Sequence, residues 1–452
     1  MEDSLLQIGS GSYGRVYLDS ANKVVIKKVD KFDTNGKNLY HSSTIREILY
    51  LANLNHPNLV QLHKITFDKY YIYLHLSYCG YSLLDLYTKE NKSKSNSINN
   101  SSVNSENLES DYNSEISEIS ENSESNITLF KFDYNIFKNQ TSNYKCDSEF
   151  KNRVQNVYNI LSSVLETIIY MNYNNIVHND LKPDNILIYD SKVYLIDLGL
   201  SKITVDNYNN THNNFKAPEL FFTNTHNYNS DLYSLALSVY FYIYGVYLED
   251  LICTTESYLL TDSDYKNFYT SIQTHSEFLE LFQNSLPFEL QKLLNTMTSF
   301  DYNKRTNPLQ LYFSDCLKPY TKPLKLEKCL KYKISFDDKY LNSKTRLKYV
   351  KQKYKFLESL NLTRLFDTSV YIFDLFCSNH KISDSATLEL ISVGSMILTC
   401  SIYDLGLDFP EYNTYLQFHK NTNRIVLFET IDVICFDLLF YTMYNFPNSN
   451  IY

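Results

Sequence analysis

The chain has 452 residues, more than one domain of ordinary size needs, so we expect at least two domains. Its net charge of −9 gives no indication of a nucleic-acid or anionic-membrane partner. Eight scattered cysteines without a CxxC pair predict free thiols rather than a disulfide framework or a zinc site. No apolar run is long enough to span a bilayer, so we expect a soluble, intracellular protein.

The N-terminal stretch contains three glycines, at positions 9, 11 and 14, followed by the apolar strand VVIK at residues 24–27. On a strand, Val25 and Lys27 point to the same face. A dinucleotide-binding Rossmann unit is excluded, because a hairpin rather than a helix follows the glycines. The glycines alone are weak evidence, since many hairpin turns contain them.

Two further elements are predicted before residue 90. The segment HSSTIREIL at residues 41–49 should open a helix that ends before the HPN sequence at 56–58, since Ser and Thr before an apolar run suit a helix cap. Residues 70–76 alternate aromatic and aliphatic side chains like a strand, and another helix should start near Leu83.

A polar segment then interrupts the pattern. Of the 36 residues from Asn91 to Asn126, 21 are Ser or Asn, which leaves too little apolar surface to offset the entropy of ordering. We predict a disordered insertion, with a phospho-acceptor or docking segment as the alternative. Beyond it, apolar residues at helical spacing predict a helix over residues 154–173.

The stretch IVHNDLKPDNILIYDSKVYLIDLG, residues 176–199, is the most informative of the chain. Its two short apolar runs predict a hairpin. Asp180, Lys182 and Asn185 precede the first strand and Asp197 follows the second, so the hairpin brings all four to one end. Two carboxylates and an amide suit a magnesium ion that also holds phosphates. Two buried strands with a polar turn are the alternative, but that structure alone does not explain why these four side chains occur together in this order.

This layout resembles the catalytic loop and metal-binding aspartate of eukaryotic-type serine/threonine protein kinases. The resemblance implies an α+β, bilobal kinase fold that transfers the γ-phosphate of ATP to protein hydroxyls. It implies that Asp180 accepts the hydroxyl proton and that Lys182 neutralises the transferring phosphoryl group. Asn185 and Asp197 would hold Mg²⁺. The nucleotide would also contact Ile8, Gly9, Gly11, Gly14, Val16, Val25, Lys27, Leu76 and Tyr78.

The same resemblance makes Glu47 the ion-pair partner of Lys27. HSSTIRE is similar to the PSTAIRE helix of cyclin-dependent kinases, which a cyclin grips and rotates into place; an ordinary kinase helix is the alternative. Asp231 matches the aspartate that anchors the catalytic loop, and Arg305 matches the partner of Glu219 in the APE motif.

Two departures from the family pattern concern regulation. Asn179 replaces the arginine of the HRD motif, which normally receives a phosphate from the activation loop. Phe215 and Lys216 replace the usual aromatic-arginine pair before APE. We therefore do not expect activation by loop phosphorylation, although all the catalytic residues are present.

The kinase-like pattern covers residues 1–319, a linker is expected at 320–340, and residues 341–452 predict an all-helical domain. Helices are expected at 346–360, 362–377, 383–403 and 425–444. Their order resembles a single cyclin box, in which Arg346 and Asp374 form a buried pair and Glu429 lies in the last helix. Ser401 stands where cyclins carry a lysine, and a helical extension of no special kind is the alternative.

We therefore expect a kinase that acts on protein substrates and that is positioned by its own C-terminal domain in cis or by a separate cyclin-like partner. The alternative is a catalytically weak, kinase-like scaffold that binds nucleotide and recruits proteins.

Overall fold

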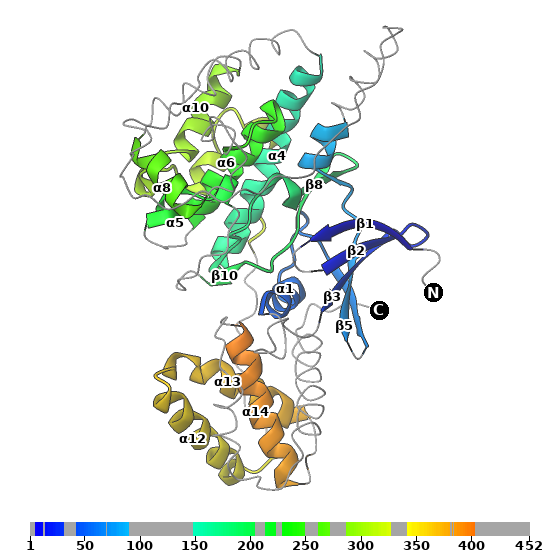
Figure 1. Ribbon diagram of the computed structural model, residues 1–452, viewed down its shortest axis with the longest axis vertical. Coiled ribbons are helices and arrows are strands. Elements are labelled where there is room, and N and C mark those ends of the chain that lie inside the picture. Colours follow the sequence, from blue (N-terminus) through cyan, green and yellow to red (C-terminus); the bar gives the residue numbers. More distant parts are fainter. Residues whose placement is uncertain are drawn as a thin grey trace, which may run out of the picture.

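The computed structural model describes residues 5–402 apart from residues 12–13, 31–41, 69, 90–147, 204–212, 223–227, 249–260, 272–285, 327–340, 380–381 and 383. The predicted insertion at 91–126 and the predicted helix at 425–444 with Glu429 lie outside this part, as does the side chain of Ser401. Within the part described, no helix combines the length and the apolar character that crossing a membrane requires. Figure 1 shows three bodies: a β-sheet lobe, a helical lobe above it and a smaller helical bundle below.

The first lobe is a five-stranded antiparallel sheet in the order β1-β2-β3-β5-β4. In β5 the burial alternates residue by residue, with Ile72, Leu74 and Leu76 buried, as expected for a strand that covers a core on one face. One helix, α1 (Ser42–Asn53), lies beside the sheet. The strands are β1 (Leu5–Gly11), β2 (Gly14–Asp19), β3 (Val24–Asp30), β4 (Leu62–Phe67) and β5 (Tyr71–Ser77).

The second lobe is mainly helical and is built around α6 (Tyr228–Tyr244), whose residues from Ser230 onward are all buried. A helix buried on every side lies in the centre of a domain. The other helices are α4 (Ser148–Tyr173), α5 (Pro218–Phe222), α8 (Asp262–Ser271), α10 (Phe288–Met297), α11 (Pro308–Tyr312) and a helix over residues 83–89. The short strands are β6 (Tyr81–Ser82), β7 (Ile176–Val177), β8 (Ile186–Tyr189), β9 (Lys192–Leu195) and β10 (Lys202–Ile203).

The predicted hairpin is formed by β8 and β9, with Ile186 opposite Leu195. Its turn residues Asp190 and Ser191 both have positive φ, 49° and 60°, which suits the twist of a two-residue hairpin turn. The hairpin therefore has a fixed register, and the residues flanking it, Asn185 and Asp197, lie at the same end.

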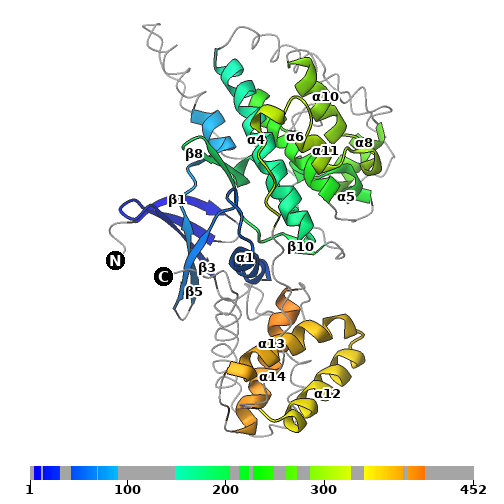
Figure 2. The same ribbon diagram turned by 180° about the vertical axis from the view of Figure 1, so that it is seen from behind.

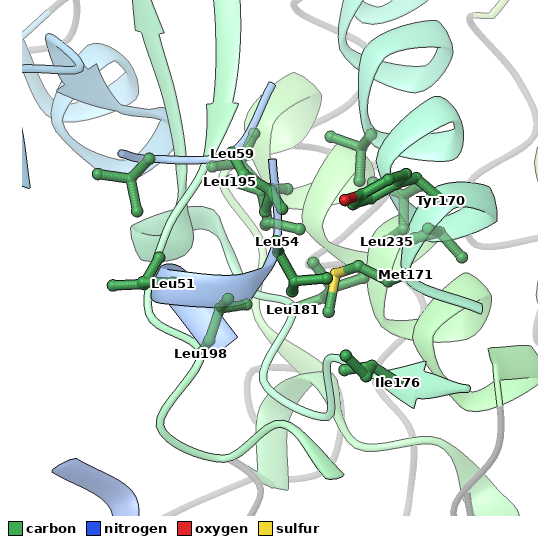
Figure 3. Close-up of a cluster of buried hydrophobic side chains, with 14 of the residues drawn as sticks. Leu51, Leu54, Leu59, Tyr170, Met171, Ile176, Leu181, Leu195, Leu198 and Leu235 are labelled. Carbon is green, nitrogen blue, oxygen red and sulfur yellow. The ribbon is translucent and has the colours of Figure 1, made fainter. Parts of the chain in front are cut away.

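A buried cluster joins the two lobes (Figure 3). It places Leu51 of α1 and Leu54, just after α1, with Met171 of α4, Leu181 of the loop between β7 and β8, and Leu195 of β9. Each of these side chains is buried, so α1 is anchored at its C-terminal end to the helical lobe.

The helical bundle consists of α12 (Ser343–Ser359), α13 (Phe366–Asn379) and α14 (Ser385–Ile402). The predicted Arg346–Asp374 pair is present, with Nε and a terminal guanidinium nitrogen of Arg346 at 2.8 and 2.5 Å from the carboxylate oxygens, but the Arg346 side chain is 26% exposed, so the pair is only partly buried. The second helix begins at Phe366, not at residue 362 as predicted, because a 3-10 turn at Thr363–Leu365 precedes it. We therefore correct its start by four residues.

Helix α14 of the bundle contacts α1 of the first lobe, and both views show the two helices side by side (Figures 1 and 2). Six consecutive residues of α1, Ser43 to Ile48, are buried. Successive residues of a helix are about 100° apart, so six of them cover its whole circumference, whereas a surface helix leaves one face exposed. The first half of α1 is thus enclosed on all sides.

Candidate active site

A cavity of about 490 Å³ lies between the two lobes, within the size range of small-molecule sites. With one exception, every residue predicted for catalysis or for nucleotide or metal binding lines it. The exception is Gly11, which pairs with Gly14 across the hairpin of β1 and β2 and does not line the cavity. Gly14 has φ of 147°, and a Cβ there would lie 2.1 Å from the Lys28 carbonyl oxygen, so only glycine fits.

Lys27, from β3, lies between two carboxylates that come from distant parts of the chain. Its Nζ is 2.9 and 2.8 Å from the two carboxylate oxygens of Glu47 on α1, and 3.4 Å from Asp197 after β9. Burial opposes the charge on Lys27, but Asp197 and Glu47 outweigh it and raise its pKa. The ammonium is therefore charged near pH 7 and lines the cavity.

The two carboxylates respond differently to burial. Burial raises the pKa of Glu47 to about 7, because desolvation outweighs the attraction of Lys27. For Asp197 burial also favours the acid, but Lys27 and the Gly199 N–H, 3.2 Å from Oδ1, hold the pKa below its usual value. Above pH 7, where Glu47 is ionised as well as Asp197, one ammonium beside two carboxylates leaves an excess of negative charge, which a bound cation would neutralise.

Asp180 is fixed by its neighbours in the catalytic loop. The Asn185 Nδ2 donates to the carbonyl oxygen of Asp180 at 2.7 Å and to its Oδ2 at 2.9 Å, and the Lys182 Nζ lies 3.0 Å from the same Oδ2. Below them, the buried Asp231 accepts the backbone N–H groups of His178 and Asn179 at 2.8 and 2.9 Å. The loop is thus held at both ends, as a positioned proton acceptor requires.

His178 is a packing and hydrogen-bonding residue of this loop. Burial lowers its pKa to about 4, so the ring is neutral near pH 7. Its Nδ1 accepts the Asp180 N–H at 3.2 Å, which leaves Nε2 to donate to the Ile196 carbonyl at 3.2 Å. The neutral ring therefore connects the catalytic loop with the residue that precedes Asp197.

Asn179, which replaces the expected arginine, makes a contact that the sequence did not reveal. Its φ of 65° is in the left-handed region that asparagine tolerates, and its Nδ2 donates to the Leu200 carbonyl at 3.2 Å. The Ser201 hydroxyl donates to the His178 carbonyl at 3.2 Å, and the Arg46 Nε donates to the Gly199 carbonyl at 3.1 Å. Side chains of the protein itself thus tie down the first residues after Asp197.

The inner part of the cavity has apolar walls. Val16, Val25 and Leu76 were predicted, while sequence reasoning missed five further apolar residues. Val60 comes from the segment between α1 and β4, and the others come from the helical lobe: Leu84, Leu187, Ile196 and Leu200. Leu187 and Ile196 belong to the apolar runs that predicted the hairpin, so their position in the cavity wall could have been inferred. Cys79 also lines the cavity; burial raises the pKa of its thiol to about 12, so the thiol is not a nucleophile here.

Asn185 and Asp197 could hold a magnesium ion in this cavity, since both line it and both offer oxygen ligands. In the described residues no group of three or more His, Cys, Asp and Glu side chains could hold a metal by itself. A cation bound here would therefore share its coordination with phosphate oxygens, which is the usual situation for Mg²⁺.

The predicted Glu219–Arg305 pair joins α5 to the residue after the 3-10 turn Tyr302–Lys304 in the helical lobe. Two guanidinium nitrogens of Arg305 contact the two carboxylate oxygens of Glu219, each at 2.6 Å, and both side chains are buried. The Ser230 hydroxyl donates to the same carboxylate at 2.9 Å. Neither residue lines the cavity, and the pair supports the fold.

We expect Arg305→Ala to lower the free energy of unfolding by about 3–5 kcal/mol, because it leaves the Glu219 carboxylate buried without its partner. Urea unfolding measures this. Lys304→Ala is the matched control, since Lys304 is exposed and lies 3.7 Å from Asp301, and such surface pairs contribute about 0–1 kcal/mol. Equal losses in the two variants would contradict the structural role of Arg305.

A family model of protein tyrosine and serine/threonine kinases matches residues 4–311. Over 93 residues the chain is 43% identical to a protein of Acanthamoeba polyphaga mimivirus that carries the name serine/threonine-protein kinase R436, covering 19% of this chain and 33% of that protein. A second mimivirus protein, named serine/threonine-protein kinase R517/R518, is 26% identical over 270 residues, or 53% of this chain and 48% of the relative.

The calcium/calmodulin-dependent protein kinase type 1 of Caenorhabditis elegans is 26% identical over 204 residues, which is 43% of this chain and 41% of the relative. The chain thus matches between about a third and a half of the length of these relatives.

Proposed function

The chain belongs to the protein tyrosine and serine/threonine kinase family, and from this premise we propose that it is an ATP-dependent serine/threonine protein kinase. The observation that carries the proposal is the contact of Lys27 with both Glu47 and Asp197. These residues come from β3, from α1 and from the end of the β8–β9 hairpin, and phosphoryl transfer requires all three in place. Two of the relatives carry the name serine/threonine-protein kinase, which supports the hydroxyl substrate.

In this proposal each residue of the cavity has one role in phosphoryl transfer. Lys27 holds the phosphates of ATP, and its ion pair with Glu47 keeps the ammonium oriented. Asp180 accepts the proton of the substrate hydroxyl, while Lys182 stabilises the charge on the transferring group. A magnesium ion held by Asn185 and Asp197 would neutralise the phosphate charge. Val16, Val25, Leu76 and Leu187 exclude water around the base.

We further propose that the C-terminal bundle holds α1 in its active position, as a cyclin does for a cyclin-dependent kinase. The enclosure of Ser43 to Ile48 and the contact between α14 and α1 support this proposal. Three hydrogen bonds support it as well: Arg46 to Gly199, Asn179 to Leu200 and Ser201 to His178. They fix the residues that follow Asp197 without a phosphate group.

A scaffold without catalysis is the competing function. Against it, the proton acceptor, the phosphate lysine and both metal ligands line one cavity. Mg·ATP at a concentration 100 times its Kd should stabilise the folded protein by about 2.7 kcal/mol and raise its Tm. A binding scaffold would show the same shift, so the deciding measurement is transfer of labelled phosphate to a serine/threonine peptide library. A Tm shift without transfer would favour the scaffold.

A further inference from the structure

Helix α12 of the C-terminal bundle carries four lysines on one face: Lys344, Lys348, Lys351 and Lys355. At 3.6 residues per turn these positions lie within an arc of about 60° and extend over about 16 Å of the helix. All four are exposed. We call this face the lysine face.

The opposite side of α12 is the one that packs into the bundle. Tyr349, Lys353 and Leu357 are buried there at intervals of four residues. Both views show α12 at the outer side of the bundle, away from α1 (Figures 1 and 2). The lysine face is therefore not the surface that contacts the kinase lobes.

Nothing among the described residues neutralises the lysine face. None of its four lysines forms an ion pair with a described carboxylate, and the one acid that borders it, Glu358, lies at its C-terminal end. Two apolar side chains flank the lysines: Leu347 is 47% exposed and Tyr354 is 42% exposed. A concentrated positive charge on a chain of net charge −9, with exposed apolar side chains beside it, indicates a surface for an acidic, partly apolar peptide.

The same chain contains a segment of that chemistry. Residues 101–126 hold seven carboxylates and no lysine or arginine. Ser-Glu repeats every three residues at 114–115, 117–118, 120–121 and 123–124, and the intervening residues include Ile116 and Ile119. Carboxylates complement the lysines, and the isoleucines complement Leu347 and Tyr354.

We propose that residues 101–126 dock on the lysine face of α12. Glu115 lies 26 positions after Lys89, the last described residue before the segment, which gives a reach of about 85 Å at full extension. Attachment to the same chain raises the effective concentration of the segment, so weak charge contacts suffice to keep it bound.

The test measures binding of a fluorescent peptide of sequence 101–126 to the protein lacking those residues, by anisotropy at about 50 mM salt, where surface charges are weakly screened. Changing Lys344, Lys348, Lys351 and Lys355 to Gln should weaken binding at least tenfold. The control changes four exposed lysines of the helical lobe, Lys151, Lys266, Lys292 and Lys318, to Gln. It removes the same charge and should change binding less than twofold.

A peptide with its four repeat glutamates changed to glutamine should bind at least tenfold more weakly to the unaltered surface. In the full chain, carbodiimide should couple Glu115, Glu118, Glu121 or Glu124 to lysines of α12. The proposal is overturned if both lysine variants bind the peptide equally, or if no such crosslink forms. It is also overturned if phosphatidylserine vesicles bind through these lysines and the peptide does not, since the face would then be a membrane surface.

Discussion

Asp180→Asn should fold normally and lose about 10²–10⁴-fold in kcat for peptide phosphorylation, because the substitution removes the proton acceptor and keeps the size of the side chain. The amide can still face Asn185 and Lys182 without distorting the loop, which Asp231 holds from below. The KM for ATP should change little, since Asp180 acts on the hydroxyl and not on the nucleotide. Steady-state kinetics with a peptide substrate measures both constants.

Asp190→Asn is the matched control for this variant. The control replaces the same side chain, a carboxylate by an amide, ten residues after Asp180. Asp190 lies in the exposed turn of the β8–β9 hairpin, where its φ of 49° suits asparagine. It should retain full activity. If Asp180→Asn keeps more than a tenth of the kcat, the assignment of the proton acceptor is wrong.

The candidate active site could be predicted from the sequence because its residues come in short motifs with fixed local geometry. The β8–β9 hairpin alone brings Asn185 next to the residues before Asp197, as the hydrogen bond from the Ile196 N–H to the Asn185 carbonyl shows. The pairing of Lys27 with Glu47 could be predicted only from the resemblance to kinases, because the two residues belong to different elements. In the structure Lys27 Nζ lies 2.8 Å from a carboxylate oxygen of Glu47.

Contacts that depend on backbone conformation or on tertiary packing could not be predicted. Asn179 could be recognised only as a lost arginine, because its bond to Leu200 depends on a φ of 65°. Nor does helical periodicity indicate which helices of distant segments meet. The resemblance to cyclins and cyclin-dependent kinases led us to expect the C-terminal domain on α1, but the pattern of α14 does not indicate that this helix, more than 300 residues after α1, makes the contact.

Separating the C-terminal bundle from the kinase lobes should lower activity at least tenfold. The reason lies in α1: without α14, the residues from Ser43 to Ile48 would lose their cover on one side, and Glu47 would no longer be held against Lys27. In the intact chain, tethering keeps the two parts together at a high effective concentration. Hydrogen exchange of residues 42–53 should accelerate on separation, since enclosed backbone is protected.

The most direct test of the account uses a protease site placed between residues 327 and 340, so that the folded full-length protein can be cut. Cleavage alone should leave activity unchanged at high protein concentration. After the bundle is removed by chromatography, activity should fall at least tenfold, and adding the purified bundle should restore it. If the separated kinase lobes phosphorylate the peptide as fast as the full chain, and exchange in α1 is unchanged, the C-terminal bundle does not position α1 and the proposal is wrong.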